Sequence, residues 1–185
     1  RSGSIDIANV PVATSTGTGT RSKSATRQQL VQLRRHVGYV MQHPEHQLFA
    51  DTVAEDVAYG QRNQGLAETA VADRVHEALE LLHIGHLADR SPFDLSGGQQ
   101  RLAAIAGVIA CNPDVLIMDE PTASLDTQAK ERIHELLRTL KQQGVTVLLI
   151  THDRAEAEAL ADRVVRMPNA AEQPDSPASD ALTNS

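Results

Sequence analysis

A short turn at residues 96–98 has the composition of an anion-binding site. Ser96, Gly97 and Gly98 directly precede a run of good helix formers, Gln99–Ala110. The free N–H groups and the positive dipole end of a helix attract anions, and glycine lets a phosphate approach the backbone where a Cβ would block it. The alternative is a helix that serine caps without any ligand. Neighbouring chemistry must distinguish the two.

Two adjacent carboxylates supply such chemistry. Asp119 and Glu120 follow the continuously apolar run Val115–Met118 and precede Pro121. That run is typical of a parallel strand buried on both faces, and ligands of open α/β sheets bind beyond the carboxyl ends of the strands. Adjacent acids there are costly unless cations or hydrogen bonds engage them. We expect Asp119 to hold Mg²⁺ and Glu120 to orient water for phosphoryl transfer, with two surface acids as the alternative.

Two further polar residues follow predicted strands. A second apolar run, Val145–Ile150, ends just before His152, and a helix predicted over Thr127–Gln143 with a stop at Gly144 separates it from Glu120. Strand, helix and strand with short joints indicate a parallel crossover, which places His152 at the same sheet edge as Glu120. Upstream, the predicted strand that begins at Val37 runs into the polar residue Gln42.

Together these segments resemble the signature, Walker B, H-loop and Q-loop segments of the ATP-binding-cassette (ABC) ATPases. The resemblance implies an α/β fold: a RecA-like P-loop NTPase core with a mainly parallel sheet and an inserted helical subdomain. It implies ATP and Mg²⁺ as cofactors. Asp119 and Gln42 would contact Mg²⁺, Glu120 would be catalytic, and His152 would be the switch residue that contacts the γ-phosphate.

ABC domains pair head to tail, so the resemblance also divides the site residues between two nucleotides. Ser96, Gly97, Gly98 and Gln99 would serve ATP bound mainly to the partner domain, whether the dimer is a homodimer or a heterodimer. Asp126 ends the segment that matches the D-loop, which crosses between the two sites. ATP-driven closure of the dimer would then drive a membrane subunit.

Residues 43–60 carry a narrower resemblance. The segments His43–Phe49 and Thr52–Gly60 are similar to the ATPase subunits of energy-coupling-factor (ECF) transporters, including the cobalt and nickel uptake group. That similarity implies import of a vitamin or a transition-metal ion with a transmembrane subunit and a substrate-binding membrane component, at the cytoplasmic face of the cell membrane. A generic ABC transporter ATPase is the alternative, and no residue here encodes the substrate.

The stretch between these motifs is predicted to be helical. Apolar residues recur at three- and four-residue spacing and form one face of a helix over about 67–83; they are Val71, Val75, Ala78, Leu79 and Leu82. This pattern fits a helical subdomain over about 52–95 that docks on the membrane partner. An ordinary packed helix would show the same pattern.

Composition limits the class of protein. The 185 residues suffice for one domain with its own core, and one cysteine, Cys111, excludes an internal disulfide. A formal charge of -7 and an aromatic content of 2% argue against a nucleic-acid partner. No apolar run is long enough to cross a bilayer, and no signal-peptide core is evident.

The two ends depart from the family pattern. Residues 168–185 read as a disordered tail or linker, to which a second ABC domain could be joined, and residues 1–167 as a partial ABC domain. An initial antiparallel β region and a Walker A loop are not evident. Gly17–Ser24 has P-loop spacing, but Ser22 replaces the required glycine, so we expect a flexible insertion over 15–24.

We therefore expect the true P-loop to lie upstream of Arg1 in a longer protein. Without Walker A, the 185 residues alone could be inactive as an ATPase. Two other classes stay open: an incomplete subunit that only completes a partner's ATP site, and a soluble ABC ATPase of the chromosome-maintenance or translation type. The latter normally shows long heptads or tandem cassettes, and neither occurs in these residues.

Overall fold

A computed structural model describes residues 3–7, 10–15, 23–24 and 26–167. The first of these form an antiparallel sheet of β1 (Gly3–Ile7), β2 (Val10–Ser15) and β3 (Lys23–Ser24), in the order β1-β2-β3. The expectation that no antiparallel region is present is therefore wrong. Strands of only five, six and two residues give a weak alternation signal, which explains the error.

This sheet also bears on the P-loop candidate. Lys23 and Ser24 lie in β3, which pairs with β2, and not at the start of a helix as a P-loop requires. The ends of the expected insertion at 15–24 are thus strand residues. Residues 16–22, and the predicted tail at 168–185, lie outside the described residues.

A three-stranded parallel sheet carries the carboxylates. Helix α1 (Arg27–His36) leads directly into β4 (Val37–Val40), and β5 (Val115–Asp119) pairs with β4 on one side and β6 (Thr146–Ile150) on the other. Helix α5 (Thr127–Gln142) connects β5 to β6, and α6 (Arg154–Leu160) follows β6. The predicted parallel crossover is confirmed, and Gly144 adopts a φ of +86° at the end of α5, as a helix stop requires.

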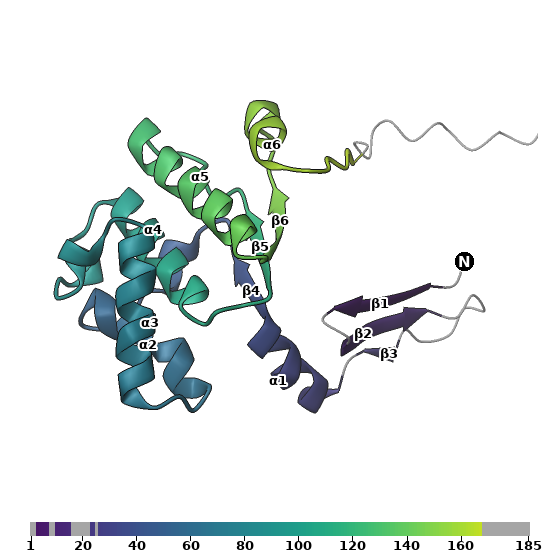
Figure 1. Cartoon of the computed structure of the whole chain (residues 1–185), viewed down its shortest axis with the longest axis horizontal. Helices are drawn as coiled ribbons and strands as arrows, with labels where there is room; N and C mark the ends of the chain where they lie inside the picture. Colours follow the sequence, from purple (N-terminus) through teal and green to yellow (C-terminus); the bar gives the residue numbers. More distant parts are fainter. Residues whose placement is uncertain (1–2, 8–9, 16–22, 25, 168–185) are drawn as a thin grey trace, which may run out of the picture.

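A group of helices lies beside this sheet (Figure 1). It contains η1 (Pro44–Gln47), α2 (Val53–Asn63), α3 (Glu68–Leu81), η2 (Gly85–Leu87), η3 (Pro92–Asp94) and α4 (Gly97–Ile109). The helix predicted over 67–83 is α3, and the apolar face predicted for it is buried. Residues 52–95 hold α2, α3, η2 and η3; their assignment as a partner-docking subdomain stays a prediction.

The parallel sheet is covered on one face. Helix α4 packs on β4 and α5 packs on β6. On that face Val40, Leu116 and Met118 are at most 1% exposed.

The opposite face carries a row of apolar side chains in register, Tyr39, Ile117 and Leu148. Tyr39 is 49% exposed and Leu148 is 53% exposed. The prediction of strands buried on both faces is therefore wrong for this face, because no element among the described residues covers it. Parallel sheets normally have both faces covered.

No helix among the described residues is long and apolar enough to cross a membrane.

Candidate functional site

Three of the predicted site positions meet at one edge of the parallel sheet. In the register of the sheet, Val40 lies beside Met118 and Asp119 lies beside Ile150. Gln42 thus follows the end of β4, Glu120 the end of β5 and His152 the end of β6. This gathering follows from the parallel direction of the strands, which brings their carboxyl ends to the same edge.

Glu120 and His152 are in direct contact. The Glu120 Oε1 atom lies 2.7 Å from His152 Nδ1 and also accepts a 2.8 Å hydrogen bond from the His152 backbone N–H. Glu120 has a φ of +49°, and its own N–H donates to the Ile150 carbonyl at 2.9 Å. A positive φ in a non-glycine residue is strained and persists only where the surroundings hold it. These bonds thus occupy Oε1 and leave Oε2 without a bond to the described residues.

The two side chains differ in exposure: Glu120 is 16% exposed and His152 is 83% exposed. The hydrogen bond that the imidazole donates to the Glu120 carboxylate, followed by the negative charge of that carboxylate, raises the pKa of His152 above its ordinary value. The contact thus favours the protonated form of the imidazole. A carboxylate held in this way is suited to accept a proton or orient a water molecule.

Helix α4 begins at Gly97, two residues before the predicted start at Gln99, and Ser96 is its N-cap. The Ser96 hydroxyl accepts from the Gln99 N–H at 3.4 Å, and the Gln99 side chain accepts from the Ser96 N–H at 3.1 Å, which makes a capping box. The capped helix named as an alternative is therefore present. It does not exclude a ligand, because a Cβ on Gly97 would meet no atom within 4 Å. The space above Gly97 is open.

The segment 96–99 is not hydrogen-bonded to the carboxylates at the edge of the sheet. Among the described residues, no side-chain hydrogen bond joins positions 96–99 to Asp119, Glu120 or His152. A Cβ on Gly98 would lie 3.6 Å from Leu125, so the turn instead neighbours the loop before α5. Asp126 caps α5 there, with its Oδ1 accepting from the Ala129 N–H at 2.8 Å.

Comparison of this sequence with known protein families identifies its family. The sequence model of the family described as ABC transporter matches residues 1–123. The chain belongs to the ABC transporter family. The match includes positions 42, 96–99 and 119–120, whereas positions 124–126 and 152 lie beyond it. The Q-loop, signature, Walker B, D-loop and H-loop roles expected for these positions stay predictions.

The ABC relatives that match are longer than this sequence. An ABC transporter ATP-binding protein of Bifidobacterium longum is 82% identical over 171 residues, which are 91% of this chain and 22% of that protein. The energy-coupling factor transporter ATP-binding protein EcfA2 of Clostridium perfringens is 45% identical over 141 residues, 75% of this chain and 50% of that protein. The chain thus spans about half or less of the relatives it matches.

Solved structures agree on the ABC fold. The structure of cbiO1 from Clostridium perfringens, part of the ABC transporter complex cbiONQ, matches with a TM-score of 0.64 and 38% identity, over 77% of this chain and 57% of that one. A dimeric ATP-binding cassette in a post-hydrolysis state with ADP and Pi matches with a TM-score of 0.68 and 29% identity, over 83% of this chain and 64% of that one. The predicted RecA-like ABC fold is confirmed.

Arg101, two residues beyond the ABC signature, is a site residue that sequence reasoning missed. It is 5% exposed. Its Nη2 donates to the Gln42 carbonyl at 2.8 Å, its Nε to Glu45 Oε2 at 3.3 Å, and its Nη1 to the Ala123 carbonyl. The available signal was a single charge at the start of the otherwise apolar stretch 102–109, where a buried cation needs partners.

Glu156 is a second missed residue, on the helix after the H-loop. It is 4% exposed, and its Oε1 accepts from the Thr122 hydroxyl at 2.7 Å and lies 3.0 Å from His134 Nε2. The network links the loop after Glu120 to the helix after His152. Nothing local in the sequence indicates it, because a glutamate in a short polar helix is normally solvated.

The donor set at the Walker B edge fits Mg²⁺. No group of three or more His, Cys, Asp or Glu side chains in the described part of the chain is placed to enclose a metal ion. Mg²⁺ commonly takes only one or two carboxylates and completes its shell with water and substrate phosphates. Asp119, at the carboxyl end of β5, and the exposed Gln42 offer oxygen ligands of that kind.

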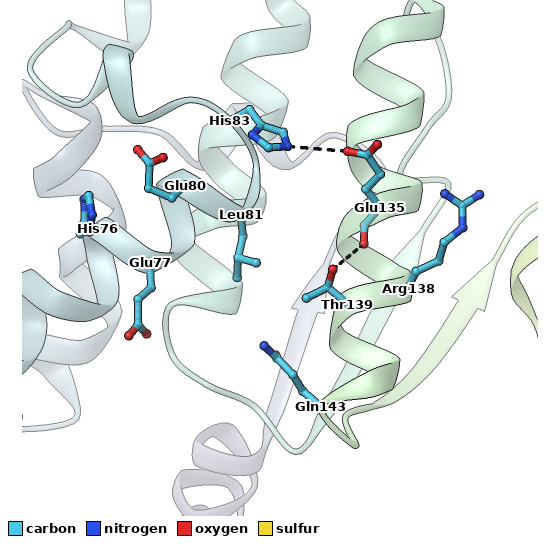
Figure 2. Close-up of a pocket in the computed structure, with 9 residues that line it drawn as sticks. All are labelled: His76, Glu77, Glu80, Leu81, His83, Glu135, Arg138, Thr139 and Gln143. Carbon is cyan, nitrogen blue, oxygen red and sulfur yellow. Dashed lines mark hydrogen bonds and ion pairs between the residues drawn. The ribbon is translucent and has the colours of Figure 1, made fainter.

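A hollow lies elsewhere on this ABC domain. A groove of about 860 Å³ separates α3 from α5 (Figure 2). His83 Nε2 and Glu135 Oε2 face each other across it at 3.6 Å. None of its lining residues is a site residue, so the groove is not the nucleotide site.

Proposed function

We propose that this chain is part of an ATP-hydrolysing ABC subunit that powers substrate import through an ECF-type membrane transporter. The observation that carries the ATPase proposal is the contact between Glu120 and His152 at the sheet edge. The similarity to EcfA2 and to cbiO1 supports the ECF type. The cargo would be a vitamin or a transition-metal ion.

The proposed chemistry begins with Glu120. Because His152 holds Oε1 through two contacts, Oε2 can accept a hydrogen bond from the attacking water and polarise it toward the terminal phosphate of ATP. The imidazole, whose pKa is raised, can donate a proton to a phosphate oxygen from its other nitrogen. Mg²⁺, held by Asp119 and Gln42, would neutralise phosphate charge.

The rest of the nucleotide site would come from other segments. Residues Ser96–Gln99 would bind the ATP of a second ABC domain, with Asp126 in the loop between the two sites; the open space at Gly97 supports this. The row of Tyr39, Ile117 and Leu148 supports a P-loop strand and helix, from outside residues 1–185, that covers this face.

A transmembrane subunit would dock beside the Q-loop. Phe49 and Tyr59 are 57% and 52% exposed and contact each other edge to face, with centroids 4.8 Å apart. Asp56 fixes the loop by accepting the Phe49 N–H at 2.8 Å and the Ala50 N–H at 2.9 Å. In a chain with two Phe, two Tyr and no Trp, an exposed aromatic pair supports a protein interface. The subunit would then lie at the cytoplasmic face of the membrane, beside a substrate-binding component.

The alternative is an incomplete ABC subunit that completes a partner's ATP site and hydrolyses nothing. The same open signature turn favours it, because the turn alone suffices for that role.

Glu120→Gln in the full-length protein tests the choice. We expect ATP turnover to fall by about 10²–10⁴-fold, because the amide cannot act as the base. Glu131→Gln, on the exposed side of α5, is the matched control and should leave turnover unchanged. Turnover that survives Glu120→Gln would contradict the proposal. A folded wild-type protein that stimulates a partner but lacks turnover of its own would establish the alternative.

A further inference from the structure

The Arg101 guanidinium joins three segments that are distant in the sequence. It lies on the signature helix α4, and it bonds the Gln42 carbonyl, the Glu45 carboxylate and the Ala123 carbonyl. The first two belong to the Q-loop and the third to the loop between Walker B and the D-loop. A planar fork of five donors can engage three acceptors at fixed angles, which a lysine ammonium cannot do.

The bond to Ala123 falls in a strained loop. Glu120 has a φ of +49° and Ser124 a φ of +62°, and Ala123 lies between them. Non-glycine residues keep such conformations only where contacts over-determine them. Arg101 supplies one of those contacts, so a shift of α4 must pull on the loop that carries Glu120.

The contact between Arg101 and Glu45 of the Q-loop is also strong. Burial alone would raise the pKa of Glu45, but its own backbone N–H, the Arg101 guanidinium and His43 together lower that pKa below its ordinary value. Glu45 is therefore an anion when it meets Arg101. A buried, charge-assisted bond of this kind resists separation more than an exposed pair does.

We propose that Arg101 is a positioning residue that couples the two nucleotide sites of the dimer. This proposal rests on the ATPase function proposed above, in which the signature binds one nucleotide and Glu120 and the Q-loop act on the other. Arg101 is then the physical link between them. Binding of ATP at the signature would be transmitted through α4 to the strained loop and the Q-loop of the opposite site.

The first test is the ATP dependence of turnover in the full-length dimer. In Arg101→Met we expect the Hill coefficient to fall to about 1 and the half-saturating ATP concentration to shift by about 5-fold or more. Arg101→Lys should behave the same way, because it keeps the charge but not the fork. Arg62→Met, which breaks the exposed pair with Glu68, is the control.

Several results would overturn the coupling role. One is a wild-type Hill coefficient of about 1. Others are a Hill coefficient in Arg101→Met that equals the wild-type value, with or without a lower maximal rate, and a wild-type Hill coefficient in Arg101→Lys. If Arg101→Met does not fold, Glu45→Gln replaces it, since it keeps an acceptor but removes the charge, and we expect a smaller loss of cooperativity.

Hydrogen exchange provides a measurement that does not need ATP turnover. In Arg101→Met, the amides of residues 41–49 and 121–126 should exchange faster together, while those of α3 stay unchanged. Faster exchange in one segment only, or in neither, would overturn the link. Absence of Glu120-dependent turnover in the wild type would instead reject the proposed ATPase function. The exchange result would still test whether Arg101 links the two segments.

Discussion

The helical region, residues 52–110, and the parallel sheet differ in how completely they bury their apolar side chains. In the helical region Val53, Leu82 and Ile84 are 0% exposed. In the sheet Leu148 is 53% exposed and Ile150 is 46% exposed. The helical region and one face of the sheet thus share a single core, whereas the other face of the sheet lies outside that core. The difference teaches that described elements cover the apolar side chains of the helical region, whereas none of them covers one face of the sheet that carries the site.

Core truncation should separate the two regions most strongly. Leu82→Ala in the 185-residue polypeptide should lower the free energy of unfolding by about 3 kcal/mol, because it leaves a cavity in a closed core. Leu148→Ala should cost less than about 0.5 kcal/mol, because that side chain is already half exposed. Urea unfolding monitored by circular dichroism measures both. Similar costs would break the comparison.

The same two variants in the full-length protein test whether a further segment covers the exposed face of the sheet. If a P-loop segment covers the sheet, Leu148→Ala should there cost about 2 kcal/mol or more. A cost that stays near zero in the longer protein would reject that cover.

A smaller effect should come from the buried network between the sheet and α6. Glu156→Ala leaves the Thr122 hydroxyl and His134 without their acceptor, and we expect a loss of about 2 kcal/mol in the free energy of unfolding. Thr122→Val should cost about 1 kcal/mol, and the double variant less than the sum. Glu68→Ala removes only the exposed partner of Arg62, which lies outside this network, and should cause no measurable change. Additive costs for the double variant would show that Glu156 and Thr122 are not coupled.

The smallest effect concerns the exposed pair at the sheet edge. Glu120 raises the pKa of His152, so their attraction is fully present below the ordinary histidine pKa and is lost as pH rises through the raised value. NMR titration of the imidazole should show a lower pKa in Glu120→Gln than in the wild type. The backbone amide chemical shifts of α3, which lies outside the site, should be the same in both proteins. An unchanged His152 pKa would mean that the contact does not persist in solution.

Local patterns in the sequence predicted most of the elements near the site. The spacing of Val71, Val75 and Ala78 indicated α3, and short apolar runs indicated β5 and β6. The prediction of strands buried on both faces failed, because burial of a strand depends on which other elements pack against it. An apolar run such as 145–150 is compatible with cover on both faces, but only packing determines whether cover exists.

The sequence by itself determined which chemical groups follow which strands, because each motif lies within a few residues of the strand or helix that positions it. Parallel strands then bring Gln42, Glu120 and His152 to one edge. Only the tertiary structure decided which atoms touch. The bonds of Arg101 and Glu156 join segments at least 22 residues apart, and such contacts depend on the packing of helices and loops, about which local sequence patterns carry no information.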